Sequence, residues 1–142
     1  MIGFKVIKIY LLAVVLAQFL KIVFGYMREH KINVRYFIET GGMPSSHSAG
    51  VASLSTSVAI IQGLRSIDFA IALLFSLIVM YEATGLRREA GRQAKAINKL
   101  IDTLIHDKKQ FEHKRLQELL GHTPLEVLSG TALGIVFALA FF

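Results

Sequence analysis

The chain has 142 residues, carries a net charge of +6 and is 54% hydrophobic, which is too apolar for a soluble domain of this length because surface must dominate there. Its lysines and arginines flank apolar stretches, an arrangement that favours anionic lipid headgroups or phosphorylated lipids over nucleic acid as partners. Cysteine is absent, which excludes a disulfide framework, a thiolate metal site and a cysteine nucleophile.

Four apolar stretches are long enough to cross a bilayer as helices of about 20 residues. In chain order they are about Ile2–Met27, Ser48–Leu64, Ile67–Ala83 and Leu125–Phe142. Only the Arg65–Ser66 turn separates the second stretch from the third, which predicts a tight helical hairpin. The first is too long for a signal peptide and no small-residue cleavage site follows it, so we expect it to be retained. The sequence therefore predicts an all-α protein, one integral membrane domain over residues 1–142, built as a multi-pass transmembrane bundle of about four spans.

A segment of different character, residues 87–121, lies between the third and fourth stretches. Charged residues alternate there with apolar residues that recur at steps of three and four. The apolar residues are Ala90, Ala94, Ile97, Ile101, Leu104 and Ile105. This pattern predicts an amphipathic helical insertion that lies along the headgroup layer. A second short helix, over about residues 109–120, follows it in this interpretation.

Basic residues are distributed unequally between the two membrane faces. With four crossings, the two termini and the turn at Arg65 share one face, which holds Lys5, Lys8 and Arg65. The remaining thirteen of the sixteen lysines and arginines lie on the other face. The positive-inside rule makes this richer face cytoplasmic. We therefore expect a cell (inner) membrane protein whose N- and C-termini are both extracytoplasmic.

Polar residues that are unusual beside membrane spans all fall at the ends that meet this cytoplasmic face. They are Lys21 and Arg28 after the first span, Pro44–His47 before the second, Glu82, Arg87 and Arg88 after the third, and His122–Glu126 before the fourth. A helical bundle brings such ends to a similar depth. We therefore expect these residues to form one pocket, and Glu82 to pair with one of the two arginines.

The order of these residues resembles the type 2 phosphatidic acid phosphatase family, which is related to vanadium-dependent haloperoxidases. The closest likeness is to the small divergent bacterial and plastid branch of that family. Lys21-x6-Arg28 resembles the family motif K-x6-RP, with glutamate in place of the proline. Pro44-Ser45-Ser46-His47 resembles PSGH, with Ser46 in place of the glycine.

The third family motif, SR-x5-H-x3-D, is split in this chain. Arg87 or Arg88 would supply its arginine, and His122-x3-Glu126 its histidine and acid, with about thirty residues inserted between them. The sequence from His122 through Gly130 and Gly134 is similar to the ending H-x-P-x-D-V-x-x-G-x-x-x-G of the divergent branch. The resemblance covers about residues 21–134.

The resemblance implies a phosphatase that forms a phosphohistidine and needs no metal or other cofactor. His122 then has the role of the nucleophile. Glu126 holds its imidazole in the correct tautomer and stabilises the positive charge. His47 protonates the leaving alkoxide and then activates water.

The same resemblance assigns phosphate binding to the basic residues and serines. Lys21, Arg28 and either Arg87 or Arg88 would neutralise a phosphoester, which carries about two negative charges near neutral pH. Hydroxyls of Ser45 and Ser46 and the N–H groups that begin the second span would add hydrogen bonds. The implied substrate is a lipid phosphomonoester or diphosphate, such as phosphatidylglycerophosphate. Membrane lipids are the expected partners, together with a second copy of the chain in a dimer.

Each motif also has a purely structural interpretation. Thr123–Glu126 fits a capping box with proline at the first helical position, and Pro44–Ser46 fits an ordinary helix start. His122 fits a solvated linker, Lys21 and Arg28 fit snorkelling anchors, and Gly130 and Gly134 fit a close helix-packing face. The alternative function is a noncatalytic protein that binds anionic lipids or assists membrane assembly.

Overall fold

The computed structural model describes residues 2–29, 42–104, 116 and 121–142. Over these residues the secondary structure is helical throughout: α1 (Ile2–Glu29), α2 (Ser46–Gln62), α3 (Ile67–Thr84), α4 (Leu86–Leu104) and α5 (Pro124–Phe141). The all-α prediction is confirmed. The predicted spans correspond to α1, α2, α3 and α5, and the start of the predicted amphipathic insertion corresponds to α4.

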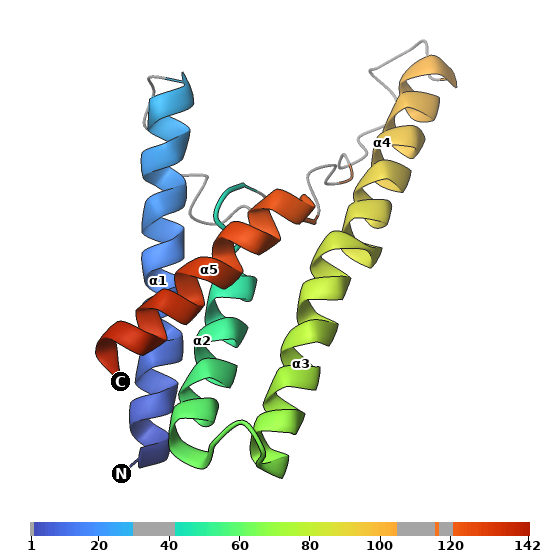
Figure 1. Ribbon diagram of the computed structural model, residues 1–142. Helices are drawn as coiled ribbons and strands as arrows, with labels where there is room; N and C mark the ends of the chain where they lie inside the picture. Colours follow the sequence, from blue (N-terminus) through green and yellow to red (C-terminus); the bar gives the residue numbers. More distant parts are fainter. Residues whose placement is uncertain (1, 30–41, 105–115, 117–120) are drawn as a thin grey trace.

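α2 is the central helix, in contact with α1, α3 and α5 (Figure 1). Its sequence is rich in alanine, glycine and serine, whose small side chains let neighbouring backbones approach closely. The buried serine hydroxyls are satisfied largely within the helix. Ser53 donates to the Gly50 carbonyl at 2.7 Å, and Ser55 donates to the Ala52 carbonyl at 3.2 Å. A helix with many hydroxyls can therefore occupy the interior of an apolar bundle.

α5 crosses α2 at backbone contact distance (Figure 1). A methyl group on Gly130 would overlap the Ser45 carbonyl oxygen, and one on Gly134 would overlap the Ala49 carbonyl oxygen. Both glycines are buried, one helical turn apart. The predicted packing face of Gly130 and Gly134 is therefore confirmed, and α2 is the helix that it contacts.

α1 and α3 pack on the other sides of α2. Gly50 faces the ring of Tyr10 and the side chain of Val14 in α1, leaving no space for a Cβ atom. On α3 the buried Ser76 hydroxyl lies 2.9 Å from the Val51 carbonyl oxygen, across the helix interface. Small residues on α2 thus determine how close both neighbours come.

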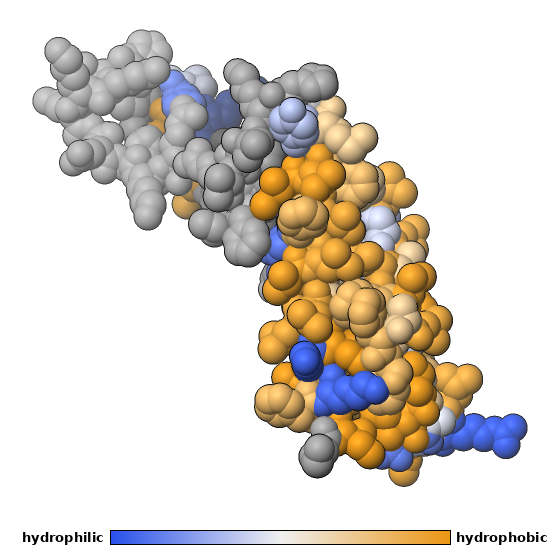
Figure 2. Space-filling model, turned by 90° about the vertical axis from the view of Figure 1, so that its left-hand side faces the viewer, coloured by the Kyte–Doolittle hydropathy of each residue, from blue (hydrophilic) through white to orange (hydrophobic). Residues whose placement is uncertain are grey.

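Three stretches of the described residues are long and apolar enough to cross a membrane: Ile2–Met27, Ile67–Thr103 and Pro124–Phe141. α2, with 17 residues, is the shortest of the described helices and packs against α1, α3 and α5. Figure 2 shows a broad apolar surface over the body of the bundle and hydrophilic residues towards its two ends. This surface is suited to contact with lipid chains.

The two chain termini and the α2–α3 connection lie at one end of the bundle (Figure 1). There the Lys5 ammonium donates to the Phe142 carbonyl oxygen at 2.5 Å and lies 4.4 Å from the centroid of the Phe142 ring. The N-terminal ends of α2 and α5 point towards the opposite end. α1 and α4 both extend beyond the start of α2 in that direction (Figure 1).

α4 is amphipathic, with Gly91, Ala94 and Asn98 buried on one face. Among the described helices it contacts α3 alone. Its placement in the headgroup layer stays a prediction. The predicted short helix at 109–120 lies outside the described residues, apart from Leu116.

Candidate active site

His122 lies just before α5 and is fixed by both its backbone and its ring. Its N–H donates to the carbonyl oxygen of Ala83, near the end of α3, at 2.8 Å. Its Nδ1 lies 3.0 Å from Oε2 of Glu126. Gly121 before it has a φ of 89°, a conformation that glycine adopts without strain. With 3% exposure, His122 is not a solvated linker histidine, and that alternative is wrong.

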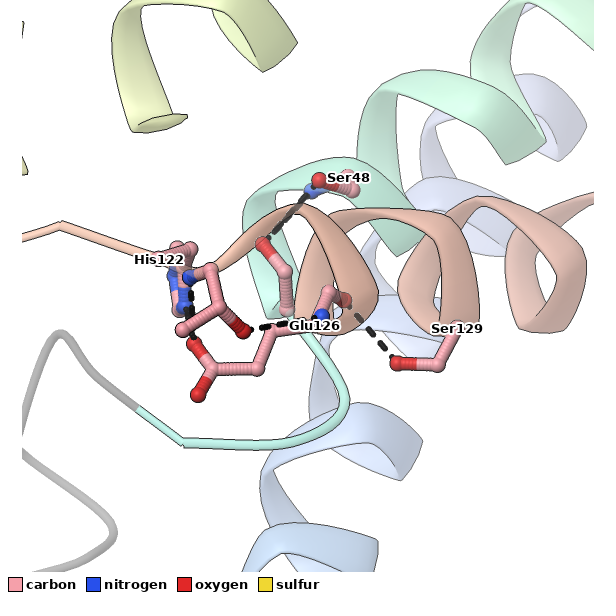
Figure 3. A network of polar contacts seen from close by, with 6 residues as sticks. Ser48, His122, Glu126 and Ser129 are labelled. Carbon is pink, nitrogen blue, oxygen red and sulfur yellow. Dashed lines mark hydrogen bonds and ion pairs between the residues drawn. The ribbon is translucent and has the colours of Figure 1, made fainter. Parts of the chain in front are cut away.

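Glu126 caps α5 and contacts His122 with the same carboxylate oxygen (Figure 3). Oε2 accepts the Thr123 N–H at 3.1 Å, while the Glu126 N–H donates to the Thr123 hydroxyl at 3.3 Å. These bonds form the capping box that the sequence indicated, with Pro124 at the start of the helix. An Nδ1–H tautomer of His122 donates to this carboxylate and leaves the lone pair on Nε2. The capping and orienting interpretations of Glu126 are therefore compatible.

The start of α2 is bonded directly to the start of α5. The Ser45 N–H donates to the Glu126 carbonyl oxygen at 2.9 Å. The Ser45 hydroxyl is the N-cap and accepts from the Ser48 N–H at 3.3 Å and from the Ser48 hydroxyl at 3.0 Å. Ser45 and Ser46 are both buried. The helix-start interpretation of these serines therefore holds, and it places the N–H groups of the first turn of α2 beside the His122 segment.

His47, in the first turn of α2, lies close to His122. The two ring centroids are 6.3 Å apart and the ring planes meet at 58°. His47 also lines a pocket of about 220 Å³ between α1, α2 and α3. Two histidines separated by 75 positions in the sequence thus face one small region.

Lys21 is buried in the bundle, with 3% exposure. Its side-chain stem lies against Gly42, where an added Cβ would be 3.3 Å from the Lys21 Cγ and Cδ atoms. Gly42 has a φ of 96°, and the segment there turns over Lys21 before Met43–Pro44, which is a cis peptide. A snorkelling anchor keeps its charged end in water. The anchor interpretation therefore does not hold for Lys21, which contacts the segment that leads into α2.

The three predicted arginines are placed by their backbones only. Arg28 lies in the last turn of α1, and Arg87 and Arg88 lie in the first turn of α4. Their side chains lie outside the described part of the structure. The described site thus comprises His47, His122, Glu126 and the helix start at Ser45–Ser46. Lys21 lies next to it, against the segment that precedes α2.

Some contacts at this site were not predicted from the sequence. One is the Ala83 carbonyl, because a main-chain oxygen has no sequence signature. A second unpredicted contact lies outside the site. Asn98 of α4 is buried and bonds both backbone groups of Leu116: Nδ2 lies 2.9 Å from the carbonyl oxygen, and Oδ1 lies 3.1 Å from the nitrogen. An amide on the apolar face of an amphipathic helix is a signal that could have indicated this role.

No group of three histidine, cysteine, aspartate or glutamate side chains gathers as a metal site among the residues that the structure describes. The His122 ring lies 3.0 Å from the Glu126 carboxylate, and its centroid lies 6.3 Å from that of the His47 ring.

Two histidines at the starts of two adjacent helices, one of them held by an acid in the next turn, bring the histidine of the second motif beside the histidine and acid of the third. Residues 3–137 match the sequence model of the Divergent PAP2 family. The chain belongs to this family. It is 42% identical over 139 residues to "Uncharacterized membrane protein YuiD" of Bacillus subtilis (strain 168), covering 91% of this chain and 88% of that protein. No solved structure matches. The predicted resemblance to the divergent branch is thereby confirmed.

Proposed function

We propose that this member of the divergent PAP2 family is a membrane phosphatase that removes the terminal phosphate of a lipid phosphate through a phosphohistidine. The observation that carries the proposal is His122. It is buried, bonded through its backbone to α3 and through Nδ1 to Glu126, and it lies 6.3 Å from a second imidazole. A nucleophile, an orienting acid and a proton donor are the three parts that such a reaction needs.

In the first step Nε2 of His122 attacks the phosphorus atom. A P–N bond forms, and the P–O bond to the lipid alcohol breaks with its electron pair on oxygen. His47, as an imidazolium, gives its proton to that oxygen. The Glu126 carboxylate accepts from Nδ1–H and stabilises the positive charge that develops on the His122 ring.

In the second step the neutral His47 takes a proton from water, and the oxygen of that water attacks phosphorus. The P–N bond breaks, its electron pair returns to Nε2, and inorganic phosphate leaves. His47 is again protonated, so the next cycle begins from the same state. One histidine therefore serves as acid and then as base.

Phosphate charge is offset from two directions in this proposal. The first turn of α2 presents backbone N–H groups and the positive end of a helix dipole, which favour an anion. Lys21 adds a cation from α1, and Arg28 with Arg87 or Arg88 are the further cations that the motifs predict. Such donors, fixed before the reaction, stabilise the charged transition state.

The placement of the site suits a lipid substrate. It lies at the starts of α2 and α5, beside the apolar body of the bundle, so acyl chains can stay in the bilayer while the phosphate reaches the histidines. With the positive-inside orientation, this end faces the cytoplasm of the cell membrane. A phosphatidylglycerophosphate-like lipid made on that side is the substrate that we propose.

The test is phosphate release by the purified full chain from phosphatidylglycerophosphate in mixed micelles, with EDTA present. We expect turnover that vanadate inhibits, and a decrease of roughly 10⁴-fold or more in His122→Ala. Labelled substrate, quenched in alkali, should leave an acid-labile label on the wild-type protein. His113→Ala, a histidine outside the motifs, is the matched control and should keep full activity.

Two outcomes would contradict the proposal in different ways. Full activity in His122→Ala would show that His122 is not the nucleophile. Absence of phosphate release by the wild-type protein across a broad set of lipid phosphates would favour a noncatalytic protein that binds anionic lipids.

A further inference from the structure

The pocket of about 220 Å³ between α1, α2 and α3 shares His47 with the candidate active site. His47 lines it, and so does Ala83, whose carbonyl oxygen accepts the His122 N–H. Its other walls are mainly apolar, formed by Val51, Phe75 and Val79. Two further polar residues line it, Tyr10 from α1 and Glu82 from α3, and the mechanism above uses neither of them.

We propose that this pocket holds the leaving group of the reaction, and that Glu82 restricts this group to an uncharged alcohol. The protein then hydrolyses lipid phosphomonoesters and discriminates against lipid diphosphates. This inference rests on the proposed function, because it assigns a substrate class to the same site.

The position of the leaving group follows from the role of His47. The oxygen that receives the His47 proton is the oxygen that departs, so the atoms bonded to it lie beside the His47 ring. The pocket is the space that this ring lines. For a phosphomonoester, those atoms are the carbons of an alcohol. For a diphosphate, attack at the terminal phosphorus expels a lipid monophosphate, and a second phosphorus with its anionic oxygens must enter the same space.

Glu82 makes the pocket unfavourable for the lipid monophosphate that a diphosphate would release. Phe75, Val79 and Glu82 lie on one face of α3, so the carboxylate stands at the end of an apolar wall. Glu82 is exposed, so its carboxylate and a phosphate in the pocket repel each other as a partly solvated pair, which still favours an uncharged leaving group. None of the described residues that line the pocket is a lysine or arginine.

The same polar groups suit an alcohol. A carboxylate oxygen accepts a hydrogen bond from a hydroxyl, and a tyrosine hydroxyl can donate or accept one. Glu82 and Tyr10 can therefore bind a hydroxyl such as those of a glycerol headgroup, while Val51, Phe75 and Val79 contact its carbons. Like charges placed close together give specificity by repulsion. This pocket would repel a leaving group that carries a second phosphate and bind an uncharged alcohol.

The experiment compares farnesyl monophosphate with farnesyl diphosphate, which share one hydrocarbon chain. Binding of each to the full-length His122→Ala protein in detergent micelles is measured by calorimetry, so that turnover does not interfere. We expect the monophosphate to bind about tenfold more tightly, and Glu82→Gln in that background to bring the ratio to within about twofold. Asp68→Asn removes the same charge from the far end of α3 and should leave the ratio unchanged.

The same ratio is also measured as kcat/KM in the protein that retains His122, for wild type, Glu82→Gln and Asp68→Asn. Equal use of the two compounds by the wild-type protein would overturn the inference, as would a ratio that Glu82→Gln does not change. If neither compound releases phosphate, the proposed function fails. The binding ratios then still decide whether Glu82 excludes a second phosphate.

Discussion

The backbone N–H of His122 donates to the carbonyl oxygen of Ala83 at 2.8 Å, which joins the start of α5 to the end of α3. A second main-chain bond, from the Ser45 N–H to the Glu126 carbonyl oxygen at 2.9 Å, joins the start of α2 to the same turn of α5. Three helices from distant parts of the sequence are thus linked by backbone at the level of the two histidines. The following substitutions test what these links and their neighbours contribute.

Replacing Glu126 separates its two roles. Glutamine also completes a capping box, so Glu126→Gln should change the free energy of unfolding by less than about 1 kcal/mol. It removes the charge opposite His122 Nδ1, and kcat should decrease by about 10²- to 10⁴-fold. Glu126→Ala should lose a further ~1 kcal/mol of stability with the cap. Phosphate release and thermal unfolding measure the two effects, and an active Glu126→Gln protein would limit Glu126 to capping.

Substitution of Gly130 tests the contact between α2 and α5. In Gly130→Ala the new methyl group meets the Ser45 backbone, and the helices must separate. We expect a loss of about 1–3 kcal/mol in stability, because main chain cannot move aside as a side chain can. Gly3→Ala is the matched control: no atom lies within 4 Å of its added Cβ, and it should be neutral or slightly stabilising. Equal unfolding temperatures for the two variants in detergent would contradict the close contact.

A pair of glycines with positive φ tests the placement of Lys21. Gly42→Ala and Gly63→Ala should both cost about 1–2 kcal/mol, because an L residue is strained at φ of 96° or 82°. Only at Gly42 does the new methyl group contact Lys21; at Gly63 it meets open space. We therefore expect Gly42→Ala alone to lower kcat/KM, by about tenfold. A similar decrease in both variants would show that backbone strain, and not Lys21, is responsible.

Asn98 is expected to hold the chain that precedes His122. Asn98→Ala removes both hydrogen bonds to the Leu116 backbone, and the Leu116 amide should then exchange with solvent about tenfold faster. Gln93→Ala changes an exposed amide on the same helix and should not alter that rate. Hydrogen exchange followed by mass spectrometry resolves the peptide. An unchanged rate in Asn98→Ala would show that other contacts hold Leu116.

Much of the fold could be predicted because it depends on local pattern. The apolar stretches gave the helices to within a few residues, and the hydroxyls of Ser45 and Thr123 marked two helix starts. The packing face of Gly130 and Gly134 was also visible as a spacing of four. The arrangement of the helices could not be predicted in this way. The central position of α2 depends on contacts between side chains that are far apart in the chain.

The candidate site could also be predicted only in part from the sequence. His47, His122 and Glu126 were found through a pattern of residue types, and the structure adds that one oxygen of Glu126 serves both His122 and Thr123. Lys21 has the same sequence surroundings whether it is a surface anchor or a buried cation, so only its burial distinguishes the two. Tyr10 reaches the His47 pocket through the rotation of α1 against α2, which no local pattern encodes.

The shortness of α2 places its first turn below the end of α1. α1, with 28 residues, is about 42 Å long and α2, with 17, about 26 Å, and the longer helix rises past the start of the shorter one. In the proposed reaction, a phosphate at the start of α2 would therefore lie below the end of α1. A lipid already anchored in the leaflet can present its phosphate there, whereas a soluble phosphate ester must give up its hydration without any gain from a buried chain. Under the proposed function, the difference in helix length would favour phosphates anchored in the membrane over soluble phosphate esters.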